Sequence, residues 1–219
     1  MTDAVSSRVC VVIVALNEAA TIESVISGAA TCGLPVVVDD GSSDATGVLA
    51  RAAGAVLVTH AVNRGYDAAL DSGFARAEEL GAEYVITLDG DGQHDPALLG
   101  SFVGELDRGA DVVIGVRDRH QRITEALFSW VGRLMWGIAD PLCGMKGYRM
   151  SLYRELGHFD SYRSIGTELA IYAAKHGKRL AEIPVKTRDR VGNTRFGGGL
   201  DANWRLLRAL FLGISKAPR

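Results

Sequence analysis

Short apolar runs alternate with longer segments of helical spacing through the first half of the chain. Residues 9–15 form a continuous apolar run, which is typical of a central strand buried on both faces. Shorter runs that favour strands follow at residues 35–38, 56–59 and 84–88. Between these runs apolar residues recur at helical spacing, for example over residues 22–33. Alternating strands and helices predict an α/β fold, with helices flanking a Rossmann-like, mostly parallel central sheet.

Further helices and one more strand extend this pattern. We expect helices over residues 43–53, 63–80, 123–138 and 165–176, and a strand over residues 111–116. The helix over residues 123–138 is strongly apolar, and we expect its aromatic residues to lie in the core.

The last segment, residues 200–219, has a pattern of its own. One face of its predicted helix is apolar and consists of Leu200, Trp204, Leu207, Phe211 and Ile214. Another face is basic and consists of Arg205, Arg208 and Lys216. Such a helix can pack on the protein or lie on an anionic membrane surface. We therefore expect one domain over residues 1–199, followed by a basic amphipathic helix on the domain or on a membrane.

The composition excludes several classes of protein. The chain has 219 residues, a net charge of −2 and 23% charged residues, which suit one domain and give no overall basic character for binding nucleic acid. Three cysteines without metal-ligand spacing indicate reduced thiols and a cytoplasmic protein. No segment is long and apolar enough to cross a bilayer.

Three of the predicted strands end in acidic or amide residues. The pairs are Asn17 and Glu18, Asp39 and Asp40, and Asp89 and Asp91. A single pair of this kind is more often a turn, because Asp and Asn bond to nearby backbone groups. The carboxyl ends of parallel strands meet at one edge of a sheet, so the three pairs together favour a ligand site there.

The stretch over residues 86–96 carries the clearest chemistry. An extended backbone puts Asp89 and Asp91 on the same side of the chain. Two carboxylates on one side can hold Mg²⁺ or Mn²⁺, and such a cation would neutralise the phosphates of a substrate. A polar turn explains Asp95 and Pro96 as the start of a helix, but it does not explain the other two acids.

Two common phosphate-binding loops are absent from the sequence. The first predicted strand is not followed by a GxGxxG loop, and no P-loop pattern occurs. A dinucleotide site is therefore disfavoured, and phosphate would be bound by a metal and by side chains.

Four short motifs follow one another in the first half of the chain: Ala15-Leu-Asn-Glu18, Val38-Asp-Asp-Gly-Ser-Ser-Asp44, Asn63-Arg-Gly65 and Leu88-Asp-Gly-Asp91. In this order they resemble the signatures of family 2 glycosyltransferases, which have the GT-A fold. The resemblance implies a donor site for a nucleotide-diphosphate sugar at Ala15, Asn17, Glu18, Asp39, Asp40, Arg64, Gly65 and Asp89. It further implies that Asp39 or Asp40 contacts the base or ribose, and that the metal is held by Asp89, Asp91 and Gln93.

The second half of the chain is similar to the dolichyl- and polyprenyl-phosphate sugar synthases. The similarity rests on an arginine after a strand, a later acid, an internal glutamate and a closing E-x-P segment, here Arg117, Asp140, Glu168 and residues 182–195. The closing pair is Thr194-Arg195 where these synthases carry Ser-Lys. The resemblance implies a polyprenyl-phosphate acceptor and an inverting transfer on the inner face of the cytoplasmic membrane.

Transfer of a hexosyl group to a lipid phosphate needs cations more than it needs a base, because that acceptor is already an anion. The candidates for binding the acceptor phosphate are Arg117, Arg133, Arg190 and Arg195. Of these, Arg117 and Arg190 match the family pattern best, so catalysis is assigned to them together with Asp91. An acceptor hydroxyl would instead need a general base, for which Asp140 and Glu168 are the candidates.

Several alternatives remain open. The same family contains enzymes that add a sugar to a hydroxyl of a surface or lipid-linked glycan, and a non-catalytic homologue could bind nucleotide sugars. A sugar-nucleotide pyrophosphorylase is disfavoured, because Leu16-Asn17-Glu18 stands where its glycine-rich loop would follow the first strand. No motif separates GDP-hexose from UDP-hexose as the donor.

Overall fold

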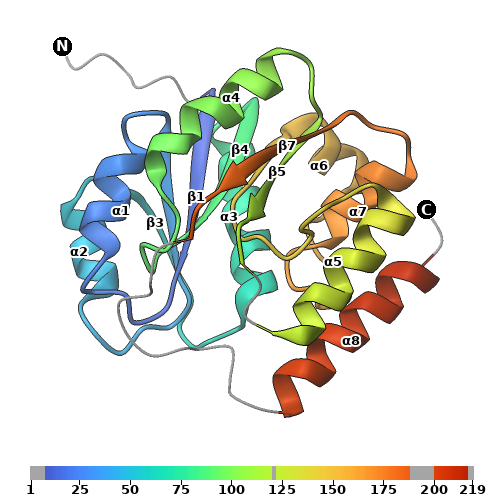
Figure 1. Ribbon diagram of the computed structural model, residues 1–219. Helices are drawn as coiled ribbons and strands as arrows, with labels where there is room; N and C mark the ends of the chain where they lie inside the picture. Colours follow the sequence, from blue (N-terminus) through green and yellow to red (C-terminus); the bar gives the residue numbers. More distant parts are fainter. Residues whose placement is uncertain (1–7, 120–121, 188–199, 217–219) are drawn as a thin grey trace.

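The computed structural model describes residues 8–119, 122–187 and 200–216, and in these residues one seven-stranded sheet forms the centre of the fold (Figure 1). The strand order is β3-β2-β1-β4-β6-β5-β7. The strands are β1 (Val9–Ala15), β2 (Leu34–Asp39), β3 (Val56–Thr59), β4 (Tyr84–Asp89), β5 (Val112–Arg117), β6 (Lys146–Arg149) and β7 (Leu180–Val185). Only β6 runs antiparallel to its neighbours, so the sheet is mostly parallel, as the alternating pattern predicts.

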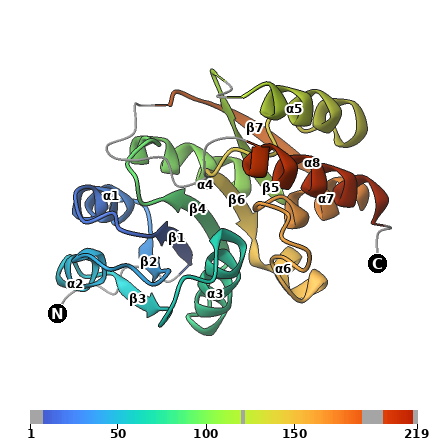
Figure 2. The ribbon, with the colours of Figure 1, turned by 90° about the horizontal axis from the view of Figure 1, so that it is seen from below.

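Helices cover both faces of the sheet, as Figure 2 shows from below. The helices on one face are α1 (Ile22–Ala29), α2 (Thr46–Ala52) and α4 (Leu99–Asp107), which follows the short 3-10 helix η1 (Pro96–Leu98). Those on the other face are α3 (Tyr66–Glu79), α5 (Ile123–Trp136), α6 (Met150–Leu156), α7 (Glu168–Lys175) and α8 (Leu200–Ser215). The apolar run of β1 explains this arrangement, because its residues alternate between the two cores, with Val12 in one and Val11 and Ile13 in the other.

The sequence pattern did not indicate three elements of the second half. Strands β6 and β7 and the short helix α6 lie in segments without a clear apolar period. Helix α7 begins at Glu168, three residues later than predicted. The backbone just before it is left-handed, with φ of 58° at Arg163 and 60° at Ile165. A β-branched residue rarely adopts this conformation, so the loop before α7 is held in place by its surroundings.

Helix α8 packs against α5 (Figure 1), and it buries Ala202, Leu206, Ala209 and Leu210. The aromatic residues of α5 divide between core and surface. Phe128 and Trp136 are buried, but Trp130 is 64% exposed, so the expectation that all of them lie in the core is wrong for Trp130. Within the described residues, no helix is sufficiently long and apolar to span a membrane.

Candidate active site

A cavity of about 460 Å³ lies at the carboxyl edge of the sheet, where β1, β2 and β4 end side by side. This is the edge at which the sequence places its three acidic pairs. The cavity is lined by seven of the predicted site residues, Glu18, Asp40, Gly65, Asp89, Asp91, Gln93 and Arg117. The structure therefore brings together residues that are as much as 99 positions apart in the chain, from Glu18 to Arg117.

The turn after β4 is fixed by its own backbone and by β1. The Gly90 amide donates to the Val14 carbonyl at 2.9 Å, and the Gly90 carbonyl accepts from the Thr21 hydroxyl at 2.6 Å. The carboxylate of Asp91 accepts from the Gln93 amide at 3.0 Å, and Asp91 as a whole is only 5% exposed. These contacts hold the Asp-Gly-Asp turn at the floor of the cavity.

Asp89 lies in close contact with the chain on the far side of the cavity. A Cβ added to Gly144 would overlap Asp89 Oδ2, so only glycine fits there. Burial, and after it the nearby charge of Asp89, raises the pKa of Tyr66 well above its usual value. His94 Nδ1 lies 3.8 Å from Asp89 Oδ2, and this nitrogen is buried without a hydrogen-bond partner in the described residues.

The oxygen ligands in the cavity fit a hard divalent cation. Asp89, Asp91 and Gln93 supply carboxylate and amide oxygens, which Mg²⁺ and Mn²⁺ prefer. Within the described residues, no group of three or more His, Cys, Asp and Glu side chains is arranged to hold a metal.

Of the two acids at the end of β2, Asp40 lines the cavity and Asp39 does not. Asp39 accepts from the Ser42 amide at 2.9 Å, and a Cβ on Gly47 would lie 2.5 Å from its other oxygen. Asp40 accepts from the backbone amides of Arg64 and Gly65 at 2.9 and 2.8 Å. The sequence left the choice between these acids open, and in the structure Asp40 is the one of the two that lines the cavity.

The loop after β1 contributes two residues to the cavity lining, Leu16 and Glu18, and the Glu18 amide donates to Thr46 Oγ1 at 2.7 Å. Ala15 is buried in the core and does not line the cavity. Asn17 is exposed and has a left-handed backbone with φ of 52°, and its side-chain oxygen accepts from the Ser43 amide at 2.7 Å. Asn17 therefore shapes the loop and does not face the cavity.

The two predicted site residues just before α3, Arg64 and Gly65, differ in their relation to the cavity. Gly65 lines the cavity and has φ of 93°, a conformation that favours glycine. Arg64 is exposed, and its guanidinium makes no hydrogen bond or ion pair with another described residue. Its side chain is absent from the cavity lining in this structure.

Arg117 lines the cavity but is held by acids. Its Nε and Nη2 donate to Asp140 at 2.7 and 2.9 Å, and its Nη1 lies 3.4 Å from Glu125. Burial alone would lower the pKa of Arg117, but its hydrogen bonds to Asp140 have the larger effect and raise that pKa. Burial alone would raise the pKa of Asp140, but the hydrogen bonds and charge of Arg117 have the larger effect and lower that pKa. The pair is therefore ionised, and Arg117 presents a cation whose fork is already oriented.

The other predicted acceptor arginines are not assembled in the cavity. Arg133 is exposed on α5 and does not line the cavity, so the structure does not bring it to the predicted site. Arg190 and Arg195 lie outside the described residues. Two arginines that the sequence analysis did not assign to the site do line the cavity, Arg122 just before α5 and Arg205 on α8. In the sequence, Arg205 was noted only as part of the basic face of the last helix, and this pattern did not indicate that it belongs to the site.

Neither candidate general base is available in the cavity. Asp140 is fully buried in its pair with Arg117 and does not line the cavity. Glu168 caps a different loop, where it accepts from the Ser161 amide at 2.5 Å and the Ser161 hydroxyl at 2.7 Å. The structure therefore does not bring either acid to the cavity lining.

Comparison with known proteins identifies the family of this fold and site. Residues 10–157 match the family described as Glycosyl transferase family 2. An uncharacterised protein of Methanocaldococcus jannaschii is 32% identical over 197 residues, which cover 82% of this chain and 81% of that protein. The undecaprenyl-phosphate mannosyltransferase of Micrococcus luteus is 30% identical over 187 residues, which cover 75% of this chain and 76% of that enzyme.

Solved structures have the same arrangement of strands and helices. The glucosyl-3-phosphoglycerate synthase of Mycobacterium tuberculosis, crystallised with Mn²⁺ and UDP-glucose, superposes with a TM-score of 0.74 and 25% identity, covering 94% of this chain and 77% of that chain. The central sheet thus has the GT-A architecture that the motifs predicted. The chain is a glycosyltransferase and belongs to family 2 of these enzymes.

Proposed function

We propose that this protein transfers a hexosyl group from GDP- or UDP-hexose to a polyprenyl phosphate, with Mg²⁺ or Mn²⁺ bound to the donor diphosphate. The observation that carries the proposal is one cavity lined both by acids at the ends of β2 and β4 and by three arginines, two of which pair with Glu125. The acids suit a metal-bound diphosphate and the arginines suit a second phosphate. The mannosyltransferase relative acts, by its name, on undecaprenyl phosphate.

The donor would occupy the acidic side of the cavity. Asp89, Asp91 and Gln93 would hold the metal, which when bound neutralises the charge of the departing nucleotide diphosphate. Asp40 and Glu18 line the part of the cavity formed by β1 and β2, and they would bind the nucleoside. The turn that holds Asp91 keeps these groups oriented before the donor arrives.

The acceptor phosphate would lie against the three arginines that line the cavity, Arg117, Arg122 and Arg205. Arg205 makes no hydrogen bond or ion pair with another described residue, so its guanidinium is available to a ligand. An acceptor phosphate is ionised at neutral pH and needs no base to attack the sugar. Direct attack on the anomeric carbon would invert its configuration.

The positions of Asp140 and Glu168 favour this acceptor over a hydroxyl. Transfer to a hydroxyl needs a base within hydrogen-bond reach of the acceptor, and neither of these acids lines the cavity. A glycan hydroxyl remains the alternative acceptor within the family, and it would have to use one of the other carboxylates that line the cavity.

A lipid acceptor also accounts for the outer surface of α5 and α8. Nine apolar side chains on these helices are 40% to 90% exposed. All of them except Met135 form what we call the apolar band: Ile123, Leu127, Trp130, Leu134, Trp204, Leu207, Phe211 and Ile214. On each helix they recur every three or four residues, opposite the buried face. Exposed apolar surface of this extent is typical of a contact with a membrane or a partner.

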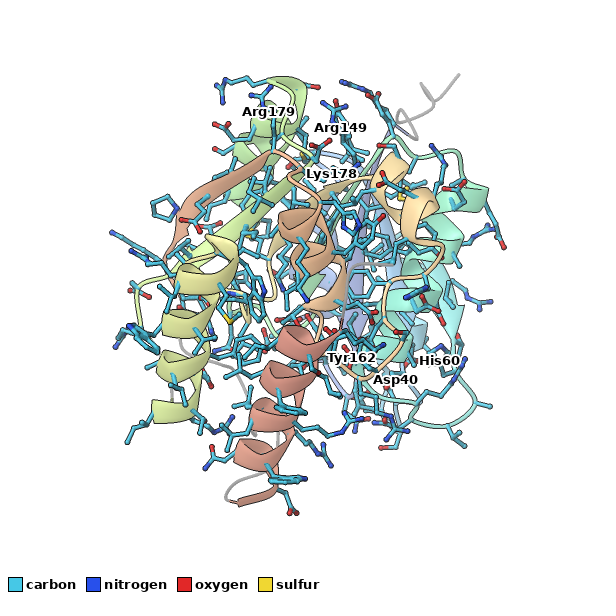
Figure 3. All side chains as sticks on the ribbon, turned by 90° about the vertical axis from the view of Figure 1, so that its right-hand side faces the viewer. Asp40, His60, Arg149, Tyr162, Lys178 and Arg179 are labelled. Carbon is cyan, nitrogen blue, oxygen red and sulfur yellow. The ribbon has the colours of Figure 1, made fainter. Side chains whose placement is uncertain are left out.

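The two halves of the apolar band adjoin. Helices α5 and α8 lie side by side in Figures 1 and 3, and the Thr124 hydroxyl donates to Asn203 Oδ1 at 2.8 Å across their seam. Among the described residues of these helices, Asp201 is the one exposed acid, against three exposed arginines, Arg133, Arg205 and Arg208. This charge balance suits an anionic bilayer, and Arg205 would place the cavity beside the lipid surface.

A transfer assay tests the proposal. The purified protein is incubated with GDP- and UDP-hexoses, with Mg²⁺, Mn²⁺ or chelator, and with or without a short-chain polyprenyl phosphate. We expect a sugar-linked lipid phosphate from one nucleotide class, only with metal, and less of it for Arg205→Ala than for Arg133→Ala. Transfer to a glycan hydroxyl but not to the lipid would overturn the proposed acceptor. Donor binding without any transfer would favour the non-catalytic homologue.

A further inference from the structure

A buried chain of three polar side chains runs behind the donor side of the cavity. His60 Nδ1 lies 2.6 Å from Asp40 Oδ1, and His60 Nε2 lies 2.9 Å from the Ser72 hydroxyl. Figure 3 shows Asp40 and His60 next to each other. His60 is 7% exposed and Asp40 is 3% exposed, so water does not separate them. His60 is the first residue after β3, as Asp40 is the first after β2.

The chemistry of the partners sets the direction of these bonds. An ionised carboxylate only accepts, so His60 Nδ1 carries a proton and donates it to Asp40. In the neutral imidazole Nε2 then accepts from the Ser72 hydroxyl, which fixes this tautomer. The His60 amide also donates to the Asp39 carbonyl at 2.9 Å, so the ring is anchored at both its backbone and its side chain.

The same carboxylate orders the turn that begins α3. Asp40 accepts from the amides of Arg64 and Gly65, and α3 has no side-chain cap from its own N-cap residue, Gly65. A Cβ on Gly41 would lie 2.6 Å from the Asn63 amide, so the two loops are in direct contact. Asp40 therefore joins the end of β2 to the start of α3, and both segments line the cavity.

A nucleophilic role for this triad does not fit its position. Ser72 lies within α3, and neither Ser72 nor His60 lines the cavity. Only Asp40 reaches it. The triad can act on a ligand in one way, through the orientation of the Asp40 carboxylate and of the Arg64–Gly65 turn.

We propose that His60 is a positioning residue of the donor site, which holds Asp40 and the Arg64–Gly65 turn in the conformation that binds the nucleotide. This inference rests on the proposed function, because it assigns the nucleoside to the part of the cavity around Asp40. The part of the inference that does not depend on the proposed function is that His60 orders the Arg64–Gly65 turn through Asp40.

Three substitutions separate the two ends of the imidazole. In His60→Asn the side-chain amide nitrogen can take the position of Nδ1 and still donate to Asp40, whereas the longer side chain of His60→Gln reaches the position of Nε2. The third variant, His60→Ala, removes both bonds. His176→Ala, at an exposed histidine after α7, is the matched control.

Two measurements are made on each full-length variant. The first is the dissociation constant of UDP and of GDP in the presence of Mg²⁺. The second is hydrogen exchange at the Arg64 and Gly65 amides of the free protein, which needs no ligand. We expect His60→Ala and His60→Gln to weaken nucleotide binding about tenfold and to speed this exchange, while His60→Asn stays close to the wild type.

Two results would overturn the inference. One is wild-type binding and exchange in His60→Ala. The other is an equal loss in His60→Asn and His60→Ala that follows their thermal stability, since this describes a merely structural histidine. If the wild type binds neither nucleotide, the proposed function fails. The hydrogen-exchange measurement still tests the role of His60 in that case, because unchanged exchange in His60→Ala would show that His60 does not order the turn.

Discussion

At the scale of single residues, the carboxylates around the cavity divide by what neutralises them. Asp39, Asp140 and Glu168 are each held by nearby donors of the protein and do not line the cavity. Asp89 and Asp91 line it, beside a nitrogen of His94 that has no hydrogen-bond partner among the described residues. A cation bound there would add to the neutralisation of these two carboxylates at the place where they face a ligand.

Asp91→Asn tests the metal site at this scale. The amide keeps an oxygen that can accept from the Gln93 amide, so the turn should survive, but the charge that attracts the cation is lost. We expect turnover to fall about a hundredfold or more, with little change in stability. The measurement is initial rate against Mg²⁺ and Mn²⁺ concentration.

Asp95→Asn is the control for that experiment. Asp95 accepts from the Ala97 amide at 3.1 Å and caps η1, and it does not line the cavity. Asparagine caps helices about as well as aspartate, so we expect near-normal activity. Equal rates for the two variants would remove Asp91 from the metal site.

Asp67 predicts a dependence of stability on pH. Burial, and after it the charge of Asp160, raises the pKa of Asp67 from 3.8 to about 6. Its Oδ1 accepts from the Gly166 amide at 2.6 Å, so it pins the strained loop before α7. Because the folded-state pKa lies above the unfolded one, Asp67 contributes stability below pH 3.8 that is lost as pH rises through about 6.

Asp67→Asn should remove this dependence, because the amide stays neutral and can still accept from Gly166. Relative to the variant, we expect the wild type to lose about 2 kcal/mol of unfolding free energy between these pH values, after allowance for solvent screening. Urea unfolding at a series of pH values measures it. Asp71→Asn, whose carboxylate accepts from the Phe159 amide at 2.9 Å, controls for loss of a carboxylate on α3. Parallel curves for wild type and Asp67→Asn would contradict the prediction.

At the scale of elements, α5 and α8 each have two apolar faces. One face of α8 packs on the domain through Leu206 and Leu210, and the other is exposed in the apolar band. A helix of a globular protein usually needs only the first face, so the second indicates another contact. The sequence pattern of this helix suits both packing and membrane contact, and the structure gives it a surface for each.

Trp204→Gln combined with Phe211→Gln tests the second face. These side chains are 69% and 67% exposed, so the folded protein should lose little stability. We expect binding to vesicles with anionic lipids to weaken at least about tenfold, because each ring removes apolar area from the bilayer contact. Co-sedimentation with vesicles measures the change.

The matched control for the apolar band is Val48→Gln. Val48 is 73% exposed on α2, on the opposite face of the sheet. It should leave vesicle binding unchanged. A double variant that binds vesicles as the wild type does would indicate that the apolar band faces a protein partner.

At the scale of the whole molecule, donor binding should stabilise the fold through the metal. The cavity joins β1, β2 and β4 with α3 and α8, so a ligand there connects both halves of the chain. With UDP or GDP at a hundred times its dissociation constant, linkage adds about 2.7 kcal/mol. For a chain of this size we expect the thermal midpoint to rise by about 5–10 °C.

Chelator controls this thermal measurement. The rise should disappear with EDTA and should be absent for the free nucleosides, because the acids bind the diphosphate only through a cation. Whichever of UDP and GDP gives the larger rise in the thermal midpoint identifies the nucleotide of the donor. An equal rise with and without EDTA would contradict the metal-dependent donor site.

Much of the first half of the protein was predictable from sequence, because its signals are local. The bounds of β1 and β3 agree with the apolar runs over residues 9–15 and 56–59, since a strand buried on both faces needs continuous apolar residues. Parallel strands end at a common edge, so the meeting of Glu18, Asp40 and Asp91 in one cavity followed from the alternation alone.

Other features depend on pairing across the fold, which no local pattern encodes. Strand β6 forms only because β4 and β5 lie on either side of it. Arg117 pairs with Asp140, and Arg205 reaches the cavity from a helix 88 positions after Arg117. His60 carried no sequence signal, because its partner is 20 positions away on a neighbouring strand.

The amino-acid sequence by itself thus determined the α/β architecture and the acidic edge, because periodicity and strand ends are properties of neighbouring residues. The tertiary structure decided which acids face the cavity and which are neutralised inside the protein. It also decided that α8 contributes both an arginine to the cavity and an exposed apolar face. These choices depend on distances between segments that are far apart in the chain, and only folding sets those distances.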